Sequence, residues 1–276
     1  MRVIQQACRC ISGLVVLSMA TLYADTNAPL CALRFPVGEV LEFTSSWGVV
    51  PVAHTAISSA WTNHNGRQMV CFRYHTSTYS VFYPVYAMED DAETISDPLT
   101  LLPETFRMTV RRRWGATWIT DATFDYSRGI CHHVYRNRRG GVLKVLDLPI
   151  NADTRDLLSF LYHIRGRLPA PGSTNNYTVV ADEGFLEMRV HYSGPDAIKI
   201  GGFPKTDCLI VTPHANFKGL IIDEGKVRMW VSRDPRCIAL RLTVDAPLAN
   251  VYVDLAKVSG PGTDIWTRGA GTIAKP

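Results

Sequence analysis

The chain has 276 residues, a hydrophobic fraction of 46% and a formal net charge of +4 at pH 7. These values are typical of a folded globular protein and exclude a fibrous or an intrinsically disordered chain. The net charge is too small to indicate binding to nucleic acid, so no nucleic-acid partner is expected.

Residues 1–24 have the pattern of a secretory signal peptide. Arg2 and Arg9 form a short basic region, an apolar run covers residues 11–22, and residues 22–24 form a cleavage site. The apolar run is short and interrupted for a bilayer span, so we predict cleavage in preference to an uncleaved anchor. No later stretch is long and apolar enough to cross a membrane, so no transmembrane segment is expected in the mature chain.

After a leader at residues 25–34, one antiparallel β domain is predicted to cover residues 35–258. Its sequence returns to short runs of alternating apolar and polar residues, typical of strands with one face in water. The Asn65-Gly66 pair predicts a tight hairpin turn, because both residues tolerate positive φ angles. Residues 259–276 are Gly-rich and are expected to form a flexible tail.

Residues 153–165 form the one stretch with the pattern of an α-helix. Asp153 or Thr154 can cap its first turn, and the prolines of residues 168–172 end it. Because an isolated amphipathic helix is unstable in water, its apolar stripe should pack against the sheet, while Arg155 is expected to face solvent. The stripe consists of Leu157, Leu161 and Ile164, widened by Leu158 and Phe160.

About fourteen short strands with hairpin-like connections predict a mainly β fold. A sheet of this size must curl or close on itself. We therefore predict a large curled antiparallel sheet, an open or flattened β-barrel, with one short amphipathic α-helix on its concave side. Two packed sheets are the alternative.

The cysteines do not form an obvious disulfide pattern. Of 7 cysteines, Cys8 and Cys10 lie in the signal segment, which leaves an odd number in the mature chain. One thiol must therefore stay single or pair between chains. Apart from Cys31, the mature chain contains four cysteines, which lie in or beside strand-like runs: Cys71, Cys131, Cys208 and Cys237. We expect these four to be small buried hydrophobic residues.

Catalytic signatures are absent from the sequence. It contains no Gly-x-Ser-x-Gly, His-Glu-x-x-His or Cys-x-x-Cys motif and no phosphate-binding Gly-rich loop. His132 and His133 are neighbours in a strand and should point to opposite faces, so they cannot hold one metal ion together. The acidic residues 89–91 are expected to form a solvated strand end. No catalytic residue, metal site or cofactor is predicted.

Two sets of residues remain as candidate binding sites. The first is a patch of arginines on strands that are predicted neighbours; it could bind an anionic envelope component, or the arginines could blunt exposed strands against edge pairing. The second is a set of large apolar residues that could line a cleft beside the helix for an apolar ligand, or simply fill the core. The arginines are Arg107, Arg111, Arg113, Arg136, Arg138 and Arg139. The apolar residues are Phe106, Met108, Trp118, Phe124, Met188, Met229 and Trp230.

Several motifs together resemble the family called domain of unknown function 3108. They include Phe35-Pro36-Val37-Gly38-Glu39, Ser46-Trp47-Gly48, Phe82-Tyr83-Pro84-Val85, the helix motif Asp156-Leu157-Leu158-Ser159-Phe160-Leu161-Tyr162, and Lys226-Val227-Arg228-Met229-Trp230. The sequence departs from the family pattern at Arg233-Asp234 and near Ala239. The resemblance implies an exported bacterial protein with a curved antiparallel β domain, most simply periplasmic, and it supplies no reaction.

These observations rank three functions. A binding or carrier module for an apolar envelope ligand or partner segment comes first, because aromatic strands, a helical lid and the lack of catalytic motifs favour it. A scaffold that docks onto an envelope protein comes second, and a hydrolase of envelope polymers comes third.

Overall fold

The computed structural model describes residues 33–268 except 85, 114–116, 167, 182–183, 218–219, 223–226, 246–248 and 263. The predicted signal peptide, most of the leader and Cys31 therefore lie outside the described residues. Sixteen strands form one sheet. They are β1 (Val40–Trp47), β2 (Val50–His64), β3 (Arg67–Thr78), β4 (Met88–Ser96), β5 (Pro103–Arg112), β6 (Trp118–Asp125), β7 (Ile130–Asn137), β8 (Val142–Pro149), β9 (Arg155–Asp156), β10 (Thr174–Ala181), β11 (Gly184–Ile198), β12 (Thr206–Phe217), β13 (Leu220–Ile222), β14 (Val227–Ser232), β15 (Ala239–Val244) and β16 (Val251–Ser259).

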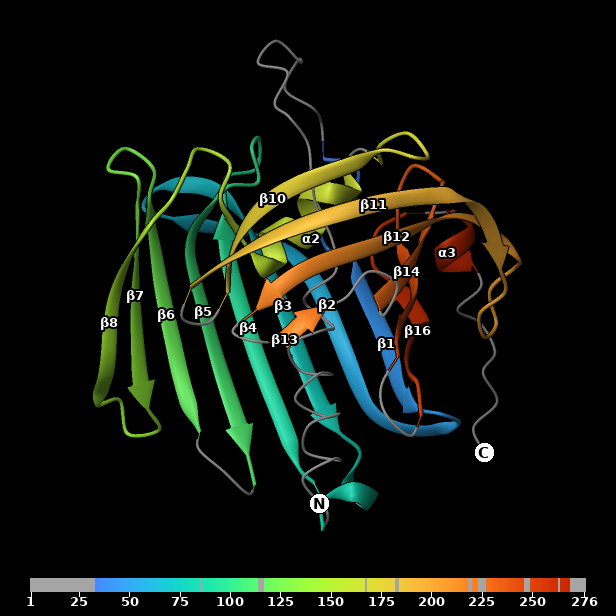
Figure 1. Ribbon diagram of the computed structural model, residues 1–276, viewed down its shortest axis with the longest axis horizontal. Helices are drawn as coiled ribbons and strands as arrows, with labels where there is room; N and C mark the ends of the chain where they lie inside the picture. The colour runs from blue at the N-terminus through green and yellow to red at the C-terminus, as the bar shows by residue number, and fades with distance from the viewer. Residues whose placement is uncertain are drawn as a thin grey trace.

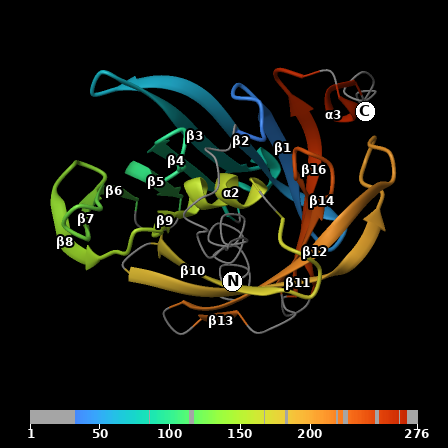
Figure 2. The same cartoon turned by 90° about the horizontal axis from the view of Figure 1, so that it is seen from above.

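Sequence neighbours pair along most of this sheet. The spatial order is β8-β7-β6-β5-β4-β3-β2-β1-β16-β15-β14-β12-β11-β10-β9, with β13 beside β12. All described pairings are antiparallel except that of β9 with β10. The sheet curls without closing, and its last strand, β9, contacts β5 across the opening (Figures 1 and 2). The predicted mainly β fold with a curled antiparallel sheet is confirmed.

Turn chemistry sets the register of the longest hairpin. Asn65 and Gly66 join β2 to β3 with φ angles of 51° and 76°, as the predicted tight turn requires. Another strand of the sheet contains a proline. This strand, β11, continues through Gly194 and Pro195, because a register shift between Tyr192 and Pro195 accommodates the proline.

The helix α2 (Leu157–Arg165) lies inside the curl, as Figure 2 shows from above. It packs on β3, β4, β9 and β10. The Tyr162 ring stacks on Phe72 with centroids 3.9 Å apart. Leu158, Phe160 and Ile164 are buried, whereas Leu157 and Leu161 are only partly buried. The buried face of α2 is therefore centred on Leu158 and Phe160, which were expected only to widen the apolar stripe. Of the predicted stripe itself, only Ile164 is buried.

Two predictions at the start of the helix are wrong. Asp156, not Asp153 or Thr154, is the N-cap, because the chain first pairs with β10 as the short strand β9. For the same reason Arg155 is buried and does not face solvent. Its guanidinium donates to the carbonyls of Asp153 (2.8 Å) and Thr100 (3.1 Å).

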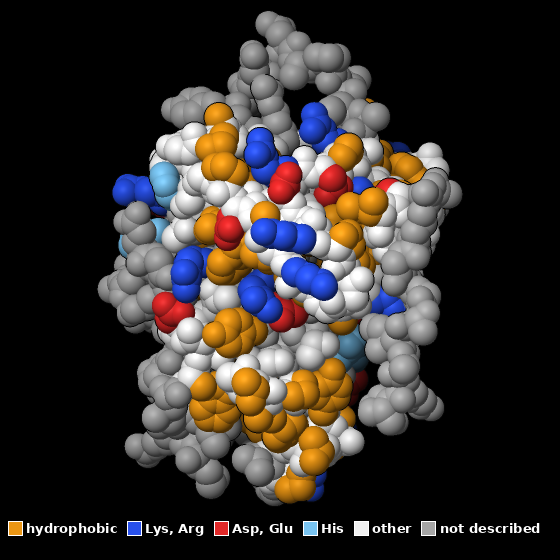
Figure 3. Space-filling model, turned by 90° about the vertical axis from the view of Figure 1, so that its right-hand side faces the viewer, with side chains coloured by type: hydrophobic (Ala, Val, Ile, Leu, Met, Phe, Trp, Pro, Cys, Tyr) orange, Lys and Arg blue, Asp and Glu red, His pale blue; other side chains and the backbone are white. Residues whose placement is uncertain are grey.

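The convex face of the sheet is covered by cross-strand ion pairs. Arg241 binds Asp254 through two contacts of 2.6 Å, and Lys257 lies 2.8 Å from Glu42. Figure 3 shows charged side chains of both signs across the middle of one such side. These pairs keep the outer face hydrated while the inner face packs on α2.

The described cysteines behave as small buried hydrophobic residues, as predicted. Cys71, Cys131, Cys208 and Cys237 are buried and unpaired with one another. Burial raises the pKa of Cys71 and of Cys131 to about 12. These thiols stay protonated at neutral pH, which makes them poor nucleophiles.

The predicted flexible tail is partly ordered. Residues 265–268 form a short helix, α3 (Ile265–Arg268), and Trp266 is buried against Phe203 with ring centroids 5.5 Å apart. Arg236 also donates to the carbonyl of Pro261 (2.9 Å). The prediction missed this because the large buried anchor, Trp266, lies within a Gly-rich stretch. Residues 269–276 lie outside the described part of the chain.

His163 on α2 predicts a pH-dependent stability. Burial, and to a lesser degree the nearby Arg155, lower the pKa of His163 to about 3. An unfolded histidine has a pKa of about 6.5, so the unfolded chain takes up the proton first as the pH falls. The stability that neutral His163 contributes is therefore complete above pH 6.5 and is lost towards pH 3.

The wild type should lose unfolding free energy when the pH is lowered from 7.5 to 4.5. In His163→Gln this loss should be smaller by about 2 kcal/mol. Urea unfolding at the two pH values measures this difference. The same pH dependence in the variant and in the wild type would contradict the neutral state of the half-buried His163.

Candidate functional site

Six of the seven predicted apolar residues lie on the concave face. On β5, Phe106 pairs with Thr94 and Ala122, and Met108 pairs with Ala92 and Thr120. Because the Thr94 hydroxyl donates to Asp156 at the start of α2 (2.8 Å), this is the face that holds the helix. By the same alternation the concave set comprises Phe106, Met108, Trp118, Phe124, Met188 and Met229.

These residues differ in how far they are covered. Met188 and Met229 are buried in the main core, and Phe124 is buried in a smaller cluster with Cys131. Phe106, Met108 and Trp118 are only partly buried, although they point into the curl. Among the six candidates, the partly exposed side chains therefore lie on β5 and β6.

Trp230 lies on the opposite face. Its neighbours in the register are Ile210 and Arg241, which point outward. The indole Nε1 donates to Asp196 (2.8 Å), and the Arg228 guanidinium stacks 5.7 Å from the ring centroid. The structure therefore separates Trp230 from the other six candidates. Adjacent residues of a strand point to opposite sides, so Met229 and Trp230 cannot share a site.

A polar band lies next to the partly exposed apolar residues. Asp90 is fully buried and binds Arg112 with both carboxylate oxygens, one of them at 2.8 Å from Nη2. The hydroxyls of Thr55 and Thr76 lie 2.8 Å apart on the same inner face. The expectation that residues 89–91 form a solvated strand end is wrong for Asp90, because the alternation of β4 turns this one residue inward.

The predicted arginine patch is partly assembled on the outside. A groove of about 570 Å³ is lined by arginine side chains. It lies at the start of β4, the end of β5 and the start of β6, at the bottom of Figure 1. Arg107, Arg111, Arg113 and Arg138 line it together with Arg112, whereas Arg136 and Arg139 do not. Arg136 instead donates to Asp121 (3.1 Å).

The groove is basic in spite of some internal pairing. Arg111 binds Asp91 and lies 3.4 Å from Glu89, and Arg107 lies 3.6 Å from Asp121. The contact with Asp91 raises the pKa of Arg111. Among the described residues that line the groove, Glu89 is the one acid. The arrangement can accept phosphate or carboxylate oxygens.

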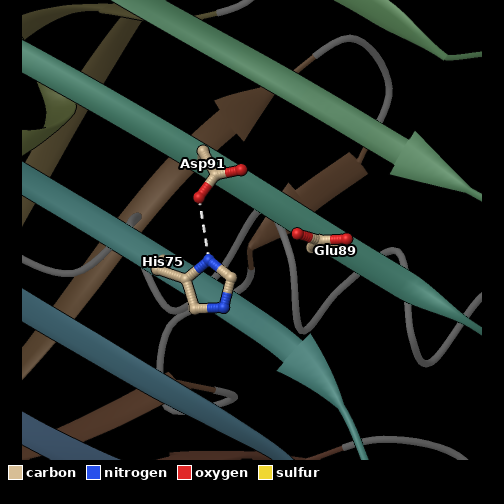
Figure 4. A group of neighbouring side chains, drawn as sticks. All are labelled: His75, Glu89 and Asp91. Carbon is tan, nitrogen blue, oxygen red and sulfur yellow. Dashed lines mark hydrogen bonds and ion pairs between the residues drawn. The ribbon is translucent and has the colours of Figure 1, made fainter.

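A possible metal cluster lies beside the groove. Figure 4 shows the His75 ring pointing to Asp91, with Glu89 further along the same strand as Asp91. His75 Nδ1 lies 2.8 Å from Asp91. The guanidinium of Arg111 already contacts both carboxylates, so it occupies the place of a cation and would repel one. We interpret the cluster as a cross-strand charge ladder.

The two neighbouring histidines point to opposite faces, as predicted. His132 is exposed, with Nδ1 2.7 Å from Asp147, while His133 is buried edge-to-face on Tyr135 with ring centroids 5.0 Å apart. Within the described residues no helix is long and apolar enough to span a bilayer.

Comparisons with known proteins place this architecture in a family. The model of the family described as "Protein of unknown function (DUF3108)" matches residues 42–255. The chain belongs to the DUF3108 family. No curated protein matches this DUF3108 chain.

Solved structures support the fold of this DUF3108 protein. It is similar to a β-barrel-like protein of the DUF1849 family from Brucella abortus, with a TM-score of 0.52 and 14% identity, over 82% of this chain and 98% of that one. A DUF1089 family protein from Pseudomonas aeruginosa matches over 84% of this chain and 97% of its own at 12% identity, but its TM-score of 0.30 is too low to indicate a common fold.

Proposed function

We propose that this DUF3108 protein is an exported, periplasmic and non-catalytic binding module that carries an apolar envelope ligand on its concave face. The observation that supports this function is the partial exposure of Phe106, Met108 and Trp118 inside the curl. Large apolar side chains on an inner face are normally covered, since burial of each contributes about 1.5–3 kcal/mol. Here α2 covers only part of that face.

The chemistry of the surroundings restricts the ligand. Phe106 and Met108 pack at the margin of the main core, so an apolar chain that lies on them would extend that core. The buried Asp90–Arg112 pair and Thr120 lie on the same inner face. Thr120 pairs directly with Met108, and Asp90 pairs with Val110, which in turn pairs with Trp118. An amphiphile with an apolar chain and a polar group therefore fits better than a pure hydrocarbon.

Titration with a fluorescent fatty-acid analogue tests the proposal. The wild type should take up the probe saturably, and Trp118→Ala should weaken the apparent affinity about five-fold or more, because a large inner contact is lost. Trp230→Ala is the matched control. It removes the same side-chain type from the outer face and should leave the affinity unchanged.

Two outcomes would reject the carrier function. One is the absence of saturable uptake by the folded wild type, which would favour a scaffold that docks onto an envelope protein. The other is an equal loss of affinity in the two tryptophan variants, which would mean that the probe does not bind inside the curl.

A further inference from the structure

Exposed apolar side chains are concentrated at one end of the molecule. Three connections lie at this end, spread across the width of the molecule at the bottom of Figure 1: the β1–β2 turn, the β3–β4 connection with its short helix η1 (Ser80–Phe82), and the β7–β8 turn. We call this the hairpin end. Six of the ten exposed large hydrophobic side chains in the described chain belong to it. They are Val49, Val50, Val81, Tyr83, Val142 and Leu143.

The most exposed of these side chains lie at the tips of the connections. Val49 is 95% exposed and Val81 is 74% exposed. Single exposed hydrophobic residues are common on any protein, but their collection at one end is not. Figure 3 shows the same distribution on one side of the molecule, where hydrophobic side chains gather at the bottom, below the band of charged residues. The tips therefore do not contribute to the core and are available for contact.

Basic side chains surround these tips. Arg138 and Arg139 lie in the β7–β8 turn, and Arg113 follows β5 and lines the arginine groove with Arg138. Two acids at this end lie close to arginines: Glu89 is 3.4 Å from Arg111, and Asp245 is 3.9 Å from Arg228. The hairpin end thus combines aliphatic tips with an excess of guanidinium groups.

We propose that the hairpin end docks onto an anionic lipid bilayer. The valine and tyrosine tips enter the interfacial region, and the arginines bind lipid phosphates. Small apolar tips on separate connections suit a bilayer, which deforms around each of them, better than a protein partner, which would need one continuous complementary surface. Guanidinium groups match phosphate oxygens and are attracted by an anionic surface.

This inference rests on residues other than those of the carrier site, so each proposal can fail without the other. Bilayer contact would, however, bring a membrane-derived amphiphile to the end of β6 at which Trp118 lies. The docking surface therefore offers a route by which the proposed ligand could be loaded.

Co-sedimentation with lipid vesicles tests the docking surface. The protein, purified in the form in which the cell produces it, is mixed with phosphatidylcholine vesicles with or without about one third phosphatidylglycerol. We expect binding to the anionic vesicles at low salt and a loss of about ten-fold or more with neutral vesicles, since an anionic surface attracts the arginines. High salt should weaken the arginine contribution and leave the apolar one.

Paired variants locate the contact. Val49→Ser with Val81→Ser, and separately Arg138→Gln with Arg139→Gln, should each weaken binding about five-fold or more. Matched controls lie at the opposite end: Trp61→Ser with Leu99→Ser, and Arg128→Gln with Arg233→Gln, should bind as the wild type does. Absence of vesicle binding, or equal losses in the control variants, would overturn the proposal.

Discussion

Replacement of Glu39 by glutamine is expected to lower the free energy of unfolding by about 3–5 kcal/mol. Glu39 is fully buried before β1, and its carboxylate binds Arg165 at the end of α2, with 3.1 Å between Nη2 and Oε2. Arg236 lies 3.8 Å from the same carboxylate. Burial acts to lower the pKa of Arg165, but contact with Glu39 raises it above its usual value. A neutral amide would leave the buried Arg165 guanidinium without its counter-charge, and it would leave Arg236 with Asp264 as its acidic partner.

Urea unfolding followed by tryptophan fluorescence measures this effect. Glu42→Gln is the control, because Glu42 is partly exposed and pairs with Lys257 (2.8 Å) on the outer face of β1. An exposed pair of this kind contributes less than about 1 kcal/mol. Similar unfolding midpoints for the two variants would show that the buried Glu39–Arg165 pair does not stabilise the fold as argued.

Replacement of Asp156 by alanine is expected to cost about 2–4 kcal/mol. Oδ1 accepts from the backbone amides of Leu158 (2.8 Å) and Ser159 (3.2 Å) and from the Thr94 hydroxyl (2.8 Å). Oδ2 accepts from the Ser159 hydroxyl (2.7 Å). The variant would lose the helix cap and leave several buried donors unpaired at the junction of α2 with β4.

Asp153→Ala is the matched control, because the sequence offers Asp153 as an equally good cap. Its side chain is exposed and lies 3.5 Å from the buried Arg155, which keeps its hydrogen bonds to the carbonyls of Asp153 and Thr100. Loss of the Asp153 side chain should therefore cost about 1–2 kcal/mol, less than loss of the Asp156 cap. Chemical denaturation of the two variants under one condition decides between them. A larger loss in Asp153→Ala would mean that the helix begins earlier than Asp156.

Most strands and the helix α2 could be predicted from the sequence because their periodic patterns are long, whereas the short helix α3 could not. The start of the helix could not, since Asp153, Thr154 and Asp156 are all acceptable caps and the choice depends on pairing of β9 with β10. The buried pair of Glu39 and Arg165 is separated by 126 positions in sequence. No local pattern carries information over that distance.

The candidate sites show the same division. Clustering of Arg107, Arg111 and Arg138 could be predicted, because β5, β6 and β7 are consecutive hairpin strands. Arg136 pairs with Asp121 and does not line the groove. This pairing depends on the register between β6 and β7, which the sequence does not determine. Alternation separates the two faces of a strand without indicating which is concave, so Trp230 was grouped with inner residues and Asp90 with solvated ones.

The pairing of β1 with β16 affects how the chain can fold during synthesis. β1 pairs with β2 on one side and with β16 on the other, so one of its two edges has no partner until the end of the domain has been made. Strands β2 to β8 form successive hairpins, each of which needs only local contacts. A nascent chain therefore carries an unpaired β1 edge that is open to aggregation, and protection of that edge, more than formation of the hairpins, should limit the yield of folded protein.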